Sequence, residues 1–223
     1  MKLVDSDVLI KESTKHMLRV LHILEGVREL DIRELDARDS MLVVIDMVNG
    51  FIKSGNMASN LIEEIVDPIL DIKRKCDAVG VSTVAFADCH TSDSVELKDY
   101  PNHCVVGTKE EELIDELKQA SIDRIINKNS TNGFLEEEFV KLLDENKNIC
   151  NFVVVGCCTD ICVQNFAITL KMWFNKNNHV SRVIVPMNAV QTYDVPGHSA
   201  LVKNVVALDA MMDNGIEVVK NII

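Results

Sequence analysis

Residues 41–51, MLVVIDMVNGF, carry the clearest strand pattern in the chain. The first five of these residues are apolar and mostly β-branched, and Asp46 ends the run. A strand buried on both faces of a parallel sheet reads as such a continuous apolar run, whereas a half-exposed strand alternates. The stretch therefore predicts a buried strand at 41–46 with a carboxylate at its carboxyl end.

Similar apolar runs recur downstream, with helical patterns between them. The runs are VSTVAFA (81–87), DRIINK (123–128), NFVVVG (151–156), SRVIVP (181–186) and IEVVKNI (216–222). The helical patterns lie near 59–79, 109–120, 134–146, 160–176 and 198–213. Strands alternating with helices in this way form right-handed βαβ units. We expect an α/β fold with a doubly wound, about six-stranded parallel sheet and helices on both faces.

The residues before the first strand have a different character. Residues 6–26 carry an apolar stripe at helical spacing, and Gly26 can end the helix. The stripe consists of Val8, Leu9, Met17, Leu18, Val20, Leu21 and Leu24. A charged stretch, 28–39, then links this helix to the rest. We divide the chain into an N-terminal helical extension, 1–40, and a main domain, 41–223. The stripe must be covered by its own domain or by a neighbour, which favours a homo-oligomer.

The composition excludes several classes of partner. A net charge of -12 repels nucleic acid and anionic membranes. Apolar runs stay well short of the roughly 20 residues that span a bilayer, and the first residues lack the apolar core of a signal peptide. The seven cysteines are an odd number, and several lie in strand-like runs, which indicates reduced thiols and a cytoplasmic protein.

Ligands of such folds bind beyond the carboxyl ends of the strands, so reactive residues at those ends are candidates for chemistry. Cys162 follows the fourth run, and Thr159 or Asp160 can cap a helix that begins there. A cysteine in the first helical turn is favoured as a thiolate by the helix dipole. The alternative is that Cys162 is only a small buried apolar residue.

Asp46 and Lys128 end two other runs. We expect them at the ends of neighbouring buried strands, where they would converge on one crevice. A carboxylate can take the proton of a thiol, and a nearby ammonium stabilises the thiolate by its charge. The alternative is an ion pair that only ties two loops together.

A second cluster follows the second run in DCHTSDSVELKDYPNHC, residues 88–104. Asp88, His90, Glu96 and His103 offer two imidazoles and two carboxylates, which suit zinc, manganese or iron better than calcium. The alternative is a polar surface loop with unrelated histidines.

Three motifs, in order, resemble the isochorismatase-like cysteine hydrolases and, within them, the nicotinamidases. A strand ends in an aspartate with a phenylalanine five residues later, here Asp46 and Phe51. A lysine, Lys128, ends the third strand and precedes NSTNGF. The most specific motif, G-x-x-T-D-x-C-V, is GCCTDICV at 156–163. The resemblance covers residues 41 to about 220.

The resemblance implies a catalytic triad in which Cys162 is the nucleophile, Asp46 the general base and Lys128 their electrostatic partner. It also implies a cis peptide bond between Cys157 and Cys158. The backbone N–H groups of Cys158 and Cys162 would then form the oxyanion hole. The chain departs from the family at this bond, where Val-Ala is usual, and at Val48, where glutamine is common.

The second cluster separates the nicotinamidases from the other members of the family. The resemblance implies that one divalent ion is bound there, with Glu96 standing where other nicotinamidases use a third histidine. The stretch from Tyr100 to Leu113, YPNHCVVGTKEEEL, also looks like the nicotinamidase loop. In that subgroup the metal holds the pyridine nitrogen, while Phe51 and Tyr100 would sandwich the ring.

The expected activity is therefore hydrolysis of nicotinamide to nicotinate and ammonia through a cysteine thioester, a step of NAD salvage. One alternative is a metal-free family member that acts on another small amide, such as an N-carbamoyl or ureido compound, because such an enzyme needs the triad but neither His90 nor His103. Another is a non-catalytic binding or assembly module. Such relatives normally lack a triad member, and all three are present here.

Overall fold

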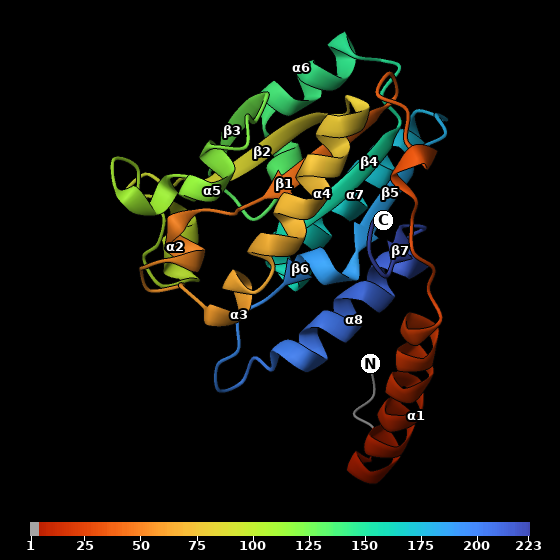
Figure 1. Cartoon of the computed structure of the whole chain (residues 1–223). Helices are drawn as coiled ribbons and strands as arrows, with labels where there is room; N and C mark the ends of the chain where they lie inside the picture. Colours follow the sequence, from red (N-terminus) through yellow and green to blue (C-terminus); the bar gives the residue numbers. More distant parts are fainter. Residues whose placement is uncertain (1–4) are drawn as a thin grey trace.

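The computed structural model describes residues 5–223 and is built around a parallel sheet of seven strands (Figure 1). The strands lie in the order β3-β2-β1-β4-β5-β7, and the short β6 pairs with the end of β4. Their bounds are β1 (Ser40–Ile45), β2 (Ser82–Asp88), β3 (Arg124–Lys128), β4 (Asn151–Cys157), β5 (Arg182–Pro186), β6 (Val190–Gln191) and β7 (Glu217–Val219). The chain builds outward from β1 to β3, then returns to lay β4 on the other side of β1. This reversal places a crevice between the carboxyl ends of β1 and β4.

Helices cover both faces of the sheet. They are α1 (Ser6–Glu25), α2 (Asn49–Ile52), α3 (Asn60–Glu63), α4 (Val66–Val79), α5 (Asp115–Lys118), α6 (Glu137–Glu145), α7 (Gln164–Lys176) and α8 (Ala200–Asp213). Alternate residues of β1 face opposite ways: Val43 packs with the apolar side chains of α6, α7 and α8, and Val44 packs with those of α4. The strand is buried throughout, as its continuous apolar run predicts.

The predicted fold class is confirmed, and the predicted strands lie within one residue of the observed ones, apart from the longer run placed over β7. Four details differ. The helix predicted over 59–79 is interrupted between α3 and α4. The helix predicted over 109–120 is reduced to a 3₁₀ turn, Lys109–Glu111, and the single-turn helix α5. The two-residue strand β6 and the single-turn helix α2 were not predicted. Elements of two to four residues are too short to show a hydrophobic periodicity in the sequence. Only their contacts in the folded chain reveal them.

The N-terminal helix α1 ends at Gly26, as predicted, and packs on α8 through its second half. Val20 and Leu24 are buried there, and His16 lies 2.8 Å from Asp209 of α8. Figure 1 shows the first half of the helix projecting past the body of the protein. Most of the predicted stripe is therefore exposed: Val8, Leu9, Leu18 and Leu21.

The charged stretch 28–39 does more than link α1 to the sheet. Leu30 is fully buried, its N–H donates to the carbonyl of Asn221, and its carbonyl accepts from the N–H of Ile223. Arg28 also forms ion pairs with Glu34 and with a residue of β7. The stretch thus joins the C-terminal edge of the sheet. The division into 1–40 and 41–223 stays a prediction. Within residues 5–223, every helix is too short or too polar to cross a membrane.

Candidate active site and metal centre

Asp46 follows β1 directly, at the crevice between β1 and β4. Its backbone has a positive φ of 54°, and its N–H donates to the carbonyl of Phe86 at 3.0 Å. Across the crevice Gly156 lies so close to β1 that a Cβ atom there would stand 2.0 Å from the carbonyl oxygen of Ile45. Only glycine permits this approach, which brings the end of β4 next to Asp46. The Asp46 side chain is fully buried.

Lys128 reaches Asp46 from β3, but not from a neighbouring buried strand as the sequence predicted. β2 lies between β1 and β3, and β3 is an edge strand with three exposed residues. In the register of β2 and β3, Lys128 is paired with Asp88. The long side chain of Lys128 therefore passes Asp88 to meet Asp46. Its Nζ lies 2.6 Å from Asp88 Oδ1 and 2.9 Å from Asp46 Oδ2.

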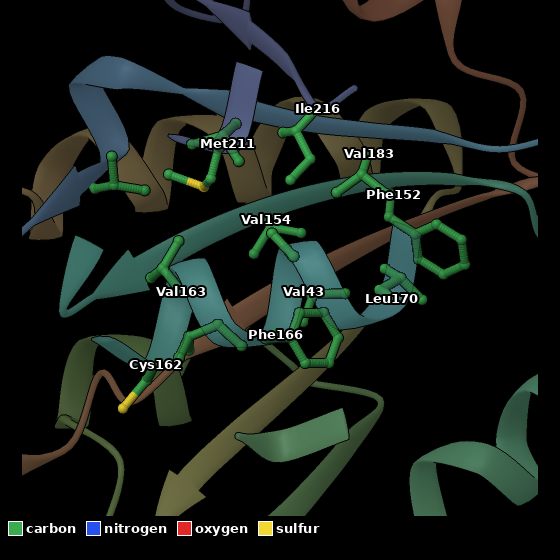
Figure 2. Close-up of a cluster of buried hydrophobic side chains, with 14 of the residues drawn as sticks. Val43, Phe152, Val154, Cys162, Val163, Phe166, Leu170, Val183, Met211 and Ile216 are labelled. Carbon is green, nitrogen blue, oxygen red and sulfur yellow. The ribbon is translucent and has the colours of Figure 1, made fainter. Parts of the chain in front are cut away.

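Cys162 completes this group at the start of α7. It lies in a π-helical turn, Thr159–Val163, in which the Cys158 carbonyl accepts N–H groups from both Ile161 and Val163. The predicted cap is wrong, because neither Thr159 nor Asp160 caps the turn with its side chain. Figure 2 shows Val163 and the residues after it packed in the core, with the sulfur of Cys162 turned away from them. Lys128 Nζ lies 3.7 Å from that sulfur.

Burial and mutual charge interactions shift the pKa values of these three side chains and so determine their protonation. Burial raises the pKa of Asp46 to about 6, although the Lys128 ammonium pulls it down. Burial alone would lower the pKa of Lys128, but the two aspartates raise it well above its usual value, so Lys128 is charged. Burial also raises the pKa of the Cys162 thiol well above its usual value, and Lys128 offsets only part of this rise. Cys162 therefore rests as a thiol, contrary to the thiolate expected from the helix dipole, and it needs a base.

Asp46 is suited to be that base. Its Oδ1 is buried and has no hydrogen-bond partner among residues 5–223. A buried carboxylate oxygen without a donor gains by accepting a proton or a hydrogen bond.

The four predicted metal ligands come together beside this group. One donor atom from each of Asp88, His90, Glu96 and His103 lies within 4.8 Å of the other three. Asp88 Oδ2 is 3.0 Å from His90 Nε2 and 2.9 Å from His103 Nε2, and Glu96 Oε1 is 3.7 Å from His90 Nε2. Such a cluster of two nitrogens and two oxygens matches the donors of zinc, manganese or iron.

Outer partners orient both imidazoles toward the cluster. His103 Nδ1 donates to the carbonyl of Pro101 at 2.6 Å, and His90 Nδ1 lies 3.0 Å from the side-chain oxygen of Asn129. A proton held at Nδ1 leaves Nε2 free to bind a metal, which is the usual arrangement of histidine ligands. The site therefore fits a divalent ion on the chemistry of its own donors.

Asp88 belongs to both groups, which the sequence did not reveal. Its Oδ1 pairs with Lys128, and its Oδ2 faces both histidines. Burial favours the neutral acid, but the Lys128 ammonium and the imidazole contacts hold the pKa of Asp88 well below its usual range. Asp88 is thus an ionised bridge between the Asp46–Lys128–Cys162 group and the cluster of four predicted metal ligands.

A pocket of about 290 Å³ opens between the two groups. Phe51 and Tyr100, predicted to hold the substrate ring, both line it, as do Cys158 and Cys162. Met57, Thr131, Ile161 and Tyr193 also line it and were not predicted. Thr131 and Ile161 lie at variable positions of two of the motifs, and Met57 and Tyr193 lie outside them, so only the folded chain shows that these side chains line the site. The peptide bond between Cys157 and Cys158 is cis, as the resemblance implies.

Comparisons with known proteins show which family the chain belongs to. Residues 40–217 match the family model described as the isochorismatase domain. The chain belongs to the isochorismatase family. This confirms the family predicted from the three motifs, and the matched segment spans the sheet from β1 to the first residue of β7.

Among sequence relatives, Nicotinamidase 1 of Arabidopsis thaliana is 36% identical over 187 residues, which cover 73% of this chain and 74% of the relative. A nicotinamidase of Acinetobacter baylyi is 28% identical over 62% of this chain and 78% of its own. Among solved structures, N-carbamoylsarcosine amidase from Thermoplasma acidophilum has a TM-score of 0.67 and 27% identity, covering 82% of this chain and 96% of that one. The zinc complex of Pyrococcus horikoshii pyrazinamidase has a TM-score of 0.66 and 23% identity, with coverage of 82% and 99%. At that identity it supports the fold alone.

Proposed function

We propose that this member of the isochorismatase family is a metal-dependent amidase that hydrolyses nicotinamide to nicotinate and ammonia. The observation that carries the proposal is the bridging aspartate, Asp88, which joins a buried Asp46–Lys128–Cys162 group to a four-donor metal cluster beside one small pocket. The nicotinamidase relatives support the same substrate. Nicotinamide hydrolysis would be a step of NAD salvage, and seven free cysteines support a reducing, cytoplasmic setting.

In the first half-reaction the unpartnered Oδ1 of Asp46 accepts the proton of Cys162. The sulfur attacks the carboxamide carbon, and the backbone N–H groups of Cys158 and Cys162 stabilise the oxyanion. Lys128 stays charged and balances the negative charge that develops on sulfur. Asp46 then gives its proton to the leaving ammonia, which leaves a thioester on Cys162.

In the second half-reaction water attacks the thioester, and Asp46 accepts its proton. Cys162 leaves as the thiol after the proton returns, so the group is restored. Splitting one amide hydrolysis into two steps lowers the barrier that either step must cross.

Asp88, His90, Glu96 and His103 would hold one divalent ion, with zinc, manganese and iron all compatible with the donors. When bound, such an ion supplies a Lewis acid with an open position for the pyridine nitrogen. Phe51 and Tyr100 line the pocket where the ring would lie.

A second candidate is hydrolysis of an N-carbamoyl compound without a metal, favoured by the likeness to N-carbamoylsarcosine amidase. The two are separated by assaying ammonia release from nicotinamide and from N-carbamoylsarcosine, each with metal-loaded and chelated protein. Release from nicotinamide that depends on the metal supports the first proposal. Release from N-carbamoylsarcosine alone, unaffected by chelation, refutes it.

The acid limb of the pH profile should report Asp46. Its carboxyl pKa is raised to about 6 by burial, so the base is protonated and inactive below that pH. We expect kcat/KM to fall roughly tenfold per pH unit below about pH 6. Metal content is measured at every pH, because protonated His90 or His103 would also release the ion. A flat profile down to pH 4.5 with the metal retained would exclude Asp46 as the base.

We also propose that the chain forms a homo-oligomer through α1 and α8, with a second copy as the occupant. Leu9 and Leu18 of α1 and Leu201 of α8 are exposed, and the two helices contact each other. The helix α1 carries both Lys11 and Glu12, so two antiparallel copies can pair opposite charges.

Light scattering at micromolar concentration is expected to give at least a dimer. Leu18→Glu should shift it toward the monomer, because it places a charge in the covered face, whereas Val180→Glu, at an exposed residue outside α1 and α8, should not. A monomeric wild-type protein contradicts this proposal.

A further inference from the structure

The loop 192–199 begins next to the nucleophile, because β6 pairs with the end of β4. In that pairing Val190 lies opposite Gly156, and Gln191 opposite Cys157. The chain that leaves β6 therefore enters the site from the side of β4. None of the triad or metal groups lies on this loop, and its role is not explained by the reaction described above.

His198 ties this loop to the turn that carries Cys162. Its Nε2 lies 2.9 Å from Asp160 Oδ2, and its Nδ1 lies 3.0 Å from the backbone carbonyl of Tyr193. The imidazole also stacks on the Tyr193 ring, with centroids 4.0 Å apart and planes inclined by 15°. Asp160 and His198 are both largely buried, with 8% and 12% of their side chains exposed. Three contacts thus hold one imidazole in place.

Tyr193 stands where two hollows meet. It lines the reaction pocket with Phe51 and Cys162, and it also lines a neighbouring outer groove with Asp194. Three residues line both hollows: Met57, Tyr100 and Tyr193. The outer groove holds about 770 Å³ of empty space and the reaction pocket about 290 Å³, each including space open to solvent. These three residues therefore lie between the small reaction pocket and the larger outer groove.

We propose that Tyr193 is a specificity-determining residue that limits the substrate to a single ring, and that His198 is the positioning residue that holds it. The inference rests on the proposed amidase function of the same pocket. An aromatic wall fixed by a stacked partner keeps its place, whereas an unsupported tyrosine on a loop can rotate into the outer groove. Without the Tyr193 side chain, the second ring of a bicyclic carboxamide can extend into the outer groove.

The first test compares nicotinamide with two bicyclic analogues, quinoline-3-carboxamide and isoquinoline-4-carboxamide, which extend the ring in different directions. The readout is the ratio of kcat/KM for each analogue to that for nicotinamide, using metal-loaded enzyme. Tyr193→Ala is expected to raise this ratio for at least one analogue by roughly tenfold or more. Tyr193→Phe retains the ring and should change it less than twofold. An unchanged ratio for both analogues in Tyr193→Ala overturns the proposal.

The second test asks whether His198 acts through Tyr193. His198→Ala should raise the same ratio in the same direction, mainly through KM, because the wall loosens while the triad is kept. His198→Phe keeps an aromatic partner for stacking and should restore part of the discrimination. Tyr193→Ala combined with His198→Ala should shift the ratio no further than Tyr193→Ala alone. Additive effects, or a loss of kcat with no change of ratio, would show a merely structural role and refute the positioning claim.

A binding experiment tests this inference independently of the proposed activity. Affinities of the three carboxamides are measured by calorimetry on metal-loaded Cys162→Ala protein, with and without Tyr193→Ala. A gain in relative affinity for a bicyclic ligand supports the wall even if the wild type hydrolyses no nicotinamide, an outcome that would refute only the proposed substrate. If Tyr193→Ala leaves the relative affinities unchanged, the proposed role of Tyr193 is refuted, whichever amide the wild type hydrolyses.

Discussion

Cys162→Ala is expected to lower kcat/KM for nicotinamide by roughly 10³-fold or more, because it removes the atom that forms the thioester. The fold should persist, since the sulfur points away from the core that Val163 and Phe166 build (Figure 2). Circular dichroism and the thermal midpoint check the fold, and ammonia release checks the activity. Acid-quenched wild-type enzyme should also carry a substrate-derived acyl group on Cys162, detectable by intact mass.

Two other cysteines serve as matched controls. Cys104→Ala removes a buried thiol that does not line the pocket. Cys157→Ala removes one whose Sγ donates to the Asp46 carbonyl at 3.2 Å, next to the site. Both are expected to retain far more activity than Cys162→Ala, although each leaves a small cavity. Substantial turnover by Cys162→Ala, or an equal loss in Cys104→Ala, would exclude the proposed nucleophile.

His90→Ala is expected to remove the metal and lower kcat/KM for nicotinamide by roughly 100-fold or more, since one of two imidazole donors is lost. Elemental analysis should find about one divalent ion per chain in the wild type and far less in the variant. Chelation of the wild type should give the same loss, and adding back zinc, manganese or iron in separate samples should identify the ions that restore activity. The metal content is the readout that does not depend on turnover.

His179→Ala is the control, because His179 is exposed and lies in a hollow with Trp173 and Asn177, apart from the cluster. It should change neither metal content nor rate. Asn129→Ala, which removes the partner of His90 Nδ1, should weaken metal affinity by about 10- to 100-fold without abolishing it. A chelated enzyme that turned over nicotinamide at full kcat/KM would refute the metal-dependent proposal and favour the metal-free amidase.

The candidate site was predictable as far as its chemistry follows from short motifs. Asp46, Lys128 and Cys162 each end or follow an apolar run, and parallel strands direct such residues to one edge of the sheet. The four metal donors lie within 16 residues of one another along a single connection, so their convergence needs little information from the rest of the chain. The protonation of Cys162 was not predictable, because it depends on burial that no motif encodes.

The parallel α/β architecture and the identities of the reactive groups follow from the sequence, because a strand buried on both faces has a continuous apolar run and the reactive groups lie at the ends of such runs. How these groups are connected depends on the tertiary fold. The strand order places β2 between β1 and β3, so Lys128 must pass Asp88, and the Asp88 carboxylate contacts both Lys128 and the two histidines of the proposed metal site. Likewise, the wall at Tyr193 exists because β6 pairs with β4. Such contacts join residues far apart in the chain, and their energies depend on distance and burial, which local sequence patterns do not specify.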